Sequence, residues 1–226
     1  MLKRKFKKAL GLSKARSIVS GGAPLQETQR TWFRKIGVSI TNGYGMTENC
    51  AITTHLGDGI IDKPGSVGLA QPGVELKIDS ETSEILMRGP FMMKEYYKQP
   101  ELTAEVIKES WLHTGDQGHI DADGFLFITG RVKDIFKTSK GKYIEPLVLE
   151  GYFGDILEFE QICVAGLGLP QPICLGVLSE IGLAKPKDEL QKYLSDYLEK
   201  VNEQLPGYKK ISTLILVKDP WAVENG

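Results

Sequence analysis

The segment VSITNGYGMTE, residues 38–48, joins a short apolar run to a turn with two glycines, an aromatic ring and a carboxylate. Its first four residues include the β-branched side chains typical of a strand, and the glycines end that strand. Upstream, RSIVS (16–20) also fits a strand, and Pro24 is suited to begin a helix between the two. This order predicts an α/β unit whose glycine-rich loop lies at the carboxyl end of the sheet, where open α/β sheets bind ligands.

The side chains of this loop suit a nucleotide. Gly43 and Gly45 allow a ligand to approach the backbone closely, and the ring of Tyr44 offers a stacking surface for a base. Thr47 can donate a hydrogen bond to a phosphate oxygen, and Glu48 can contact Mg²⁺. The alternative interpretation is a tight turn that leaves a strand, and the loop alone does not separate the two.

Composition excludes several other classes of protein. The 226-residue chain is 41% hydrophobic with a net charge of −1, so it can bury a core and has no global field that attracts nucleic acid. Its three cysteines and three histidines fit neither a disulfide framework nor a zinc site, which indicates a reducing cytoplasm. No apolar run is long enough to span a bilayer, and neither a P-loop nor a Ser/His/Asp arrangement occurs.

The first ten residues, MLKRKFKKAL, carry five positive charges, and Leu2, Phe6 and Leu10 recur every fourth residue. This spacing predicts a short amphipathic helix. A solvated helix face is the simpler interpretation. Weak peripheral contact with lipid headgroups at the inner membrane face is the alternative.

From residue 65 to residue 130 the chain changes to short strand-like segments separated by turn signals. Asp-Ala-Asp-Gly (121–124) predicts a hairpin turn, and a helix is expected from Glu101 to about Lys108. Asp116 is expected in a glycine-flanked loop, where its two carboxylate oxygens could accept hydrogen bonds from both hydroxyls of a ribose. The expected strands are VELKI, EILMRG, GHIDA and FLFITG.

A third pattern begins at residues 131–134, where we place a domain boundary. Arg131 has a fork of donors for ribose or phosphate, and the basic stretch 130–146 also fits a solvated strand pair. ICVAGLGL, ICLGVLS and ISTLILV are expected as strands, and residues 187–205 as a helix with one apolar face. The sequence therefore predicts a small α/β domain after the boundary.

Four motifs taken together are more specific than any one of them. SGGAP (20–24), GYGMTE (43–48), TGD (114–116) and GRVKDIFKTSKGKYIEP (130–146) resemble, in this order, the adenylate-forming (AMP-binding) superfamily. The resemblance covers nearly the whole chain. KTSKGKYIEP and the final WAVENG are most similar to the long-chain fatty acid–CoA ligases of bacterial type.

The resemblance implies a domain organisation. Residues 1–131 would be the C-terminal part of the large AMP-binding domain, with an α/β portion (1–58) followed by a small β-barrel-like unit (59–131). Residues 132–226 would form the small C-terminal α/β domain, truncated at its end, with the hinge between the domains at 131–134.

The implied reaction has two steps and uses ATP, Mg²⁺ and coenzyme A. A fatty acid attacks the α-phosphate of ATP to give an acyl-adenylate, and the thiol of CoA then displaces AMP. The family's phosphate loop and its adenylation lysine do not occur in this sequence. The resemblance therefore implies a fragment of an ATP-dependent long-chain fatty acid–CoA ligase, which is inactive alone and has the missing part of its large domain as a partner.

The resemblance also assigns roles to single residues. The first two motifs would surround the adenine, with Tyr44 stacked on it. Thr47 and Glu48 would be catalytic, holding a phosphate and Mg²⁺. Asp116 and Arg131 would bind the ribose. The full set is Gly22, Ala23, Gly43, Tyr44, Gly45, Thr47, Glu48, Asp116 and Arg131 in the large domain, with Lys133 as the hinge and Gly141 beside the pantetheine of CoA.

Two alternatives stay open at this point. A sibling enzyme would deliver the acyl group to a carrier protein in place of CoA. A non-catalytic truncated homologue would bind nucleotide or a partner protein without turnover. Neither the acyl chain length nor the oligomeric state follows from the sequence.

Overall fold

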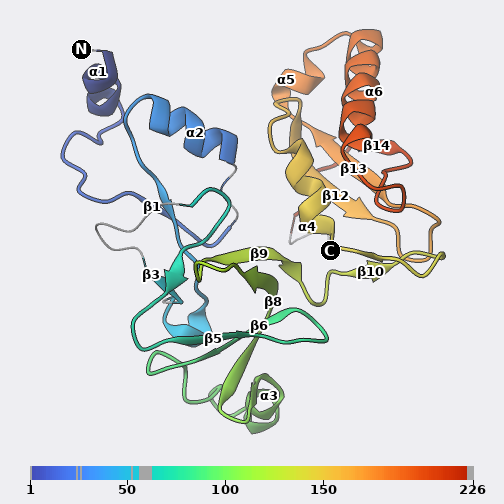
Figure 1. Cartoon of the computed structure of the whole chain (residues 1–226). Coiled ribbons are helices and arrows are strands. Elements are labelled where there is room, and N and C mark those ends of the chain that lie inside the picture. The colour runs from blue at the N-terminus through green and yellow to red at the C-terminus, as the bar shows by residue number, and fades with distance from the viewer. Residues whose placement is uncertain (1, 24, 26, 52, 56–62, 223–226) are drawn as a thin grey trace. The chain divides into compact units, whose positions relative to one another are not determined.

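The chain folds into two compact units, Met1–Val132 and Lys133–Gly226. The computed structural model describes residues 2–23, 25, 27–51, 53–55 and 63–222. Figure 1 colours the first unit from blue to yellow-green and the second from there to red. Both units mix helices and strands, which confirms the predicted α/β class. The break between the units lies inside the segment 131–134.

The first part of unit 1 has the predicted strand–helix–strand order. Its elements are α1 (Leu2–Ala9), β1 (Val19–Ser20), α2 (Glu27–Lys35), β2 (Thr41–Asn42), η1 (Thr47–Asn49), β3 (Thr54–His55) and β4 (Leu69–Ala70). Strands β1 and β2 pair in parallel, with Val19 opposite Thr41 and Ser20 opposite Asn42. Because parallel strands point the same way, the loops that follow β1 and β2 start at the same edge.

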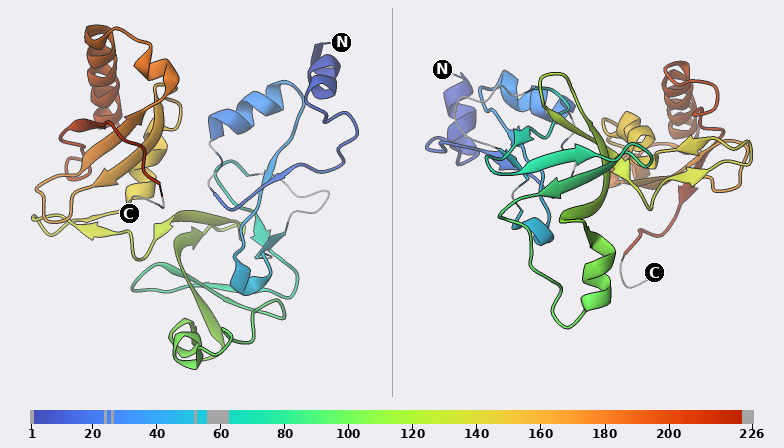
Figure 2. Two further views of the ribbon diagram at one scale, coloured as in Figure 1. Left: turned by 180° about the vertical axis from the view of Figure 1, so that it is seen from behind. Right: turned by 60° about the horizontal axis from the view of Figure 1, so that its bottom comes forward.

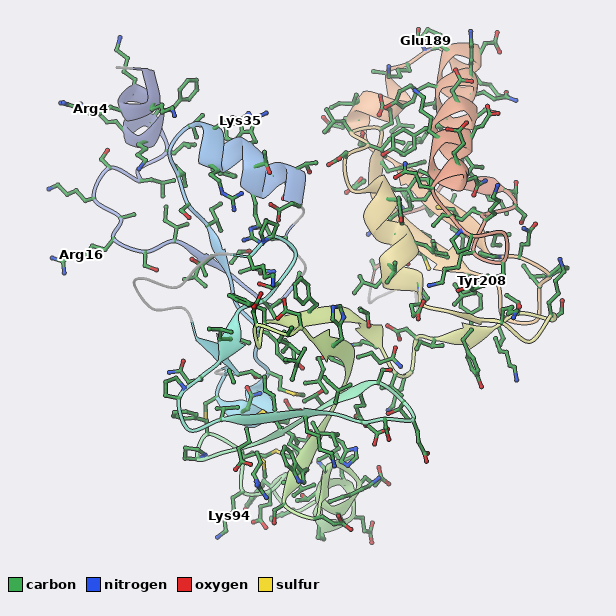
Figure 3. The ribbon with its side chains drawn as sticks, in the orientation of Figure 1. Arg4, Arg16, Lys35, Lys94, Glu189 and Tyr208 are labelled. Carbon is green, nitrogen blue, oxygen red and sulfur yellow. The ribbon has the colours of Figure 1, made fainter. Side chains whose placement is uncertain are left out.

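The predicted N-terminal helix is confirmed as α1. Phe6 within α1 and Leu10 just after it are 41% and 47% exposed. Arg4 projects from the helix away from the ribbon (Figure 3). Among the helices that the structure describes, none combines the length and the apolarity needed to cross a membrane.

The second part of unit 1 is an antiparallel sheet. Its elements are β5 (Glu75–Ile78), β6 (Glu84–Arg88), α3 (Pro100–Val106), β7 (Ile107–Lys108), β8 (Trp111–Ile120) and β9 (Leu126–Arg131). The strand order is β5-β6-β8-β7, and β9 pairs with the second half of β8. The described strands do not close into a barrel, because β5 pairs only with β6 and β7 pairs only with the start of β8. The expected barrel-like unit is therefore an open sheet.

Strand β6 lies at the centre of this sheet and is covered on both faces. Ile85, Leu86 and Met87 are all buried in succession, whereas a strand with one solvated face would alternate. Ile85 packs with Leu126 in one apolar cluster, and Met87 packs with Leu112 in another. Because Leu112 belongs to β8, this core holds in place the strand that carries Asp116.

The expectation that Asp116 lies in a loop is wrong. Asp116 lies within β8, opposite Arg131 of β9. One of the two glycines that suggested a loop, Gly118, is needed here for close packing. Gly118 follows a bulge in the pairing, and a Cβ at this position would lie 2.3 Å from the carbonyl oxygen of Phe127. The predicted hairpin turn is confirmed, because the Asp121 carboxylate accepts hydrogen bonds from two backbone N–H groups of the turn.

Unit 2 is a small α/β unit. Its elements are β10 (Phe136–Lys137), β11 (Tyr143–Ile144), α4 (Pro146–Glu150), η2 (Gly151–Phe153), β12 (Phe159–Ala165), β13 (Ile173–Leu178), α5 (Glu180–Leu183), α6 (Lys187–Glu203) and β14 (Leu214–Val217). The sheet has the order β12-β13-β14, with β12 antiparallel and β14 parallel to β13. Figure 2 shows α6 alongside this sheet.

Helix α6 confirms the predicted helix of residues 187–205. Its buried residues Leu190, Leu194 and Val201 fall on one face, as their spacing requires. Val201 packs in the core with Val164 of β12 and Cys174 of β13. This apolar face, rather than helix propensity alone, holds the helix on the sheet.

Candidate functional site

The loop GYGMTE leaves β2 in a tightly folded form. The Gly43 N–H donates to the carbonyl oxygen of Ser20 at the end of β1 (2.8 Å), and the Ala51 N–H donates to the carbonyl oxygen of Met46 (2.8 Å). A Cβ at Gly45 would lie 2.3 Å from the carbonyl carbon and oxygen of Ala51. Glycine is therefore required at position 45 for packing within the loop itself.

Asn49 holds this loop from inside, although it was not among the residues predicted for the site. Its side chain is fully buried. Its oxygen accepts a hydrogen bond from the Met46 N–H (3.0 Å), and its amide donates to the Thr53 hydroxyl (2.6 Å). Beside it, the Tyr44 N–H donates to the Thr54 hydroxyl (3.0 Å). Satisfied buried polar networks of this kind favour one loop conformation.

Tyr44, Asp116 and Arg131 form one hydrogen-bonded chain. The Tyr44 hydroxyl donates to Asp116 Oδ2 (2.7 Å), and Arg131 Nε donates to Asp116 Oδ1 (3.0 Å). Tyr44 and Asp116 are 72 residues apart in sequence. Three of the four motifs therefore meet at one carboxylate. An ionised carboxylate has about four lone-pair sites, so each oxygen of Asp116 can accept a further donor.

The environments of these three side chains differ. Burial raises the pKa of the Tyr44 hydroxyl well above its ordinary value, so this group remains a protonated donor. The Asp116 side chain is 11% exposed, whereas that of Arg131 is 64% exposed. The arrangement therefore has a buried end at the tyrosine and a solvent-accessible end at the arginine.

Thr47 and Glu48 belong to the short helix η1. Thr47 is exposed and Glu48 is half-buried. The Tyr96 hydroxyl donates to Glu48 Oε1 (2.6 Å), and this hydrogen bond raises the pKa of Tyr96 to about 12. No group of three or more potential metal ligands occurs among the described residues. One carboxylate still fits Mg²⁺, which is usually bound through one or two carboxylates together with substrate phosphates.

The loop after β1 begins beside the start of GYGMTE. Gly22 has a φ of +82°, in the left-handed region, and both Gly22 and Ala23 are exposed. A Cβ at Gly21 would lie 3.1 Å from the carbonyl oxygen of Gly43, so the two loops are in close contact. Asn42, the last residue of β2, is buried, and its side-chain oxygen has no hydrogen-bond donor among the described residues. Asn42 was not among the site residues predicted from the sequence.

The remaining predicted site residues belong to unit 2. Lys133 is its first residue and is exposed. Gly141 lies in the turn between β10 and β11 with a φ of +75°. The strand pair predicted in the basic stretch is thus present, and Lys137 stacks over the Tyr143 ring at 5.2 Å.

Comparison with known proteins decides the family. The family model described as AMP-binding enzyme matches residues 1–97. Long chain acyl-CoA synthetase 2 of Arabidopsis thaliana is 30% identical over 254 aligned residues, which cover 98% of this chain and 38% of the relative. The chain belongs to the adenylate-forming, AMP-binding family. The long-chain-fatty-acid–CoA ligase FadD15 of Mycobacterium bovis is 40% identical over 151 residues, 65% of this chain and 24% of that ligase.

Solved structures of this adenylate-forming family share the fold. The o-succinylbenzoate CoA synthetase of Bacillus subtilis, in complex with its acyl-adenylate intermediate, has a TM-score of 0.76 at 26% identity over 90% of this chain and 43% of that one. The anthranilate CoA ligase AuaEII, in complex with anthranoyl-AMP, has a TM-score of 0.74 at 26% identity over 92% of this chain and 42% of that one. The chain thus spans less than half the length of these relatives.

Proposed function

We propose that the chain is the C-terminal portion of an ATP-dependent long-chain fatty acid–CoA ligase and carries the adenosine-binding residues of that enzyme. The observation that supports this most strongly is the chain Tyr44–Asp116–Arg131, which joins three motifs at one carboxylate. The names of the curated relatives, long-chain acyl-CoA synthetase and long-chain-fatty-acid–CoA ligase, support the substrate class.

The described residues suit an adenosine. The Tyr44 ring would stack on the base, with the loops at Gly22–Ala23 and Gly43–Gly45 against its edge. Within the described part of the chain, the side-chain oxygen of Asn42 is a buried acceptor without a donor, and an unmet buried acceptor costs about 1–3 kcal/mol. The amino group of adenine is a donor that could satisfy it. Asp116 and Arg131 would hold the ribose hydroxyls.

Thr47 and Glu48 would act at the phosphates. The exposed Thr47 hydroxyl can donate to a phosphate oxygen, and Glu48 would hold Mg²⁺. A bound Mg²⁺ neutralises charge on the phosphates of ATP. In this chain the short helix η1 carries both the Thr47 hydroxyl and the Glu48 carboxylate, and it comes directly after the loop at Gly43–Gly45.

Unit 2 would serve the second half-reaction. We propose Lys133 as the hinge, because the chain passes from one compact unit to the other at this residue. Gly141, in its exposed turn, leaves room for the narrow pantetheine of CoA. A carrier protein carries the same thiol arm, so it is the alternative acceptor. A thioester assay on the full-length enzyme with CoA and with carrier protein in parallel separates the two acceptors.

Two partners belong to this proposal. One is the remaining part of the large domain, since the relatives are longer than this chain. The other is a lipid surface, which α1 would contact through Phe6, exposed among its basic residues, together with the exposed Leu10 just after the helix. Vesicle co-sedimentation tests the second partner, because binding to anionic lipid must weaken as salt is added. Binding that does not respond to salt would exclude it.

The test of the proposed function is calorimetric titration of AMP into the purified chain. We expect binding that Asp116→Ala weakens by at least about tenfold, because hydrogen bonds to a charged group are lost. Asp196→Ala is the matched control, since Asp196 is an exposed acid on α6 in the other unit. Equal affinities of the Asp116 variant and the unaltered chain would contradict the proposal.

A further inference from the structure

The segment between β6 and α3 holds Glu48 at two points. The Met93 N–H donates to the carbonyl oxygen of Glu48 (2.6 Å), and the Tyr96 hydroxyl donates to its carboxylate oxygen Oε1 (2.6 Å). One contact fixes the backbone of Glu48 and the other fixes its side chain. Glu48 is therefore held in one orientation by a segment that belongs to none of the four sequence motifs.

Tyr96 is itself held by the first turn of α3. Its N–H donates to the Thr103 hydroxyl (2.9 Å), and that hydroxyl donates to the carbonyl oxygen of Gln99 (2.9 Å). Tyr96 is half-buried, whereas its neighbour Tyr97 is 80% exposed. Of two adjacent tyrosines, only the one that reaches Glu48 is packed against the protein.

From this geometry we infer that Tyr96 is a positioning residue that makes Glu48 a one-oxygen ligand for a small divalent cation. The inference rests on the proposed function. The phenol occupies Oε1, and among the described residues no donor contacts Oε2. A carboxylate with one oxygen engaged this way offers the other to a cation. Ca²⁺ accepts a carboxylate through one or both oxygens in a flexible geometry, whereas Mg²⁺ demands near-ideal octahedral geometry, which a carboxylate bound through both oxygens distorts. Tyr96 therefore favours Mg²⁺ over Ca²⁺.

The test is a titration of Mg²⁺, and separately of Ca²⁺, into the chain at fixed ATP, with ATP binding followed by calorimetry. In Tyr96→Phe we expect the Mg²⁺ concentration for half-maximal ATP binding to rise by about tenfold or more, as losses of such supporting contacts do. The preference for Mg²⁺ over Ca²⁺ should also fall. The Tyr97→Phe variant, altered at the exposed neighbour, should match the unaltered chain.

Binding of AMP without metal separates this inference from the proposed function and from misfolding. The inference predicts that Tyr96→Phe binds AMP as the unaltered chain does, since Glu48 does not contact the adenosine in the proposed arrangement. An unchanged Mg²⁺/Ca²⁺ preference in Tyr96→Phe would overturn the inference and leave the proposed function standing. If the unaltered chain binds neither AMP nor ATP, the proposed function fails and the inference fails with it. Weakened AMP binding in Tyr96→Phe would show a general structural role and also overturn the inference.

Discussion

Replacement of Tyr44 by Phe tests the hydrogen bond on which the site depends. The substitution keeps the ring and removes only the hydroxyl that donates to Asp116 Oδ2 at 2.7 Å. The Asp116 side chain is only 11% exposed, so water replaces the lost donor poorly. Hydrogen bonds to charged groups contribute about 1.5–3 kcal/mol. We therefore expect Tyr44→Phe to lower the free energy of unfolding of unit 1 by about 2 kcal/mol at neutral pH.

The pH dependence of this loss identifies its cause. The pKa of the Tyr44 hydroxyl is raised in the folded state above its unfolded value of about 10. The folded state thus keeps a proton that the unfolded state releases, and the contribution of Tyr44 to stability falls as pH rises above about 10. The difference in stability between the unaltered chain and Tyr44→Phe should therefore shrink above about pH 10, by at most about 1.4 kcal/mol per pH unit.

Urea unfolding followed by circular dichroism, at about pH 8 and about pH 11, measures this difference. Tyr97→Phe is the control, since Tyr97 is 80% exposed and should show no change at either pH. Equal stability of Tyr44→Phe and the unaltered chain at the lower pH would refute the buried hydrogen bond. A difference that stays constant with pH would refute the role of the hydroxyl proton.

Two further predictions concern the loop and the thiols. Gly45→Ala should destabilise unit 1 by about 3 kcal/mol or more in thermal unfolding, because its Cβ would lie 2.3 Å from the Ala51 carbonyl. Gly151→Ala is the control and should be neutral, because the space around its Cβ is open. A stable Gly45→Ala would contradict the described loop. Thiol labelling at about pH 8 should modify the exposed Cys50 first and leave Cys174 unmodified until unit 2 unfolds, because burial raises the pKa of Cys174 to about 12. Equal labelling rates would show that Cys174 is accessible.

Local sequence signals predicted the elements that depend on local chemistry. The apolar spacing of residues 187–205 predicts α6, and Asp-Ala-Asp-Gly predicts the turn between β8 and β9. The same local reasoning gave a wrong prediction for TGD (114–116), which was expected in a loop and lies in β8. Gly115 and Gly118 indicate a loop, but Gly118 is required by the contact with the Phe127 carbonyl in a paired strand. A glycine chosen for close packing has the same appearance in a sequence as one chosen for a turn.

The contacts within the candidate site depend on residues far apart in the chain. The pairing of Tyr44 with Asp116 needs the sheet that places β8 beside the loop, and no spacing rule contains it. Asn42, Asn49 and Tyr96 were missed for a related reason. Each is an ordinary polar residue in sequence, and its importance comes from burial or from a partner brought close by the fold. A signal for them would require a comparison of many related sequences.

The most direct measurement of the central claim is a crystal structure of the chain grown with AMP. We expect the adenine to stack on the Tyr44 ring at about 3.5–4 Å. Both ribose hydroxyls should lie within about 2.5–3.0 Å of the Asp116 carboxylate oxygens. Asn42 Oδ1 should accept a hydrogen bond from the base. An AMP molecule bound elsewhere, with Tyr44 and Asp116 contacting only each other, would contradict the central claim.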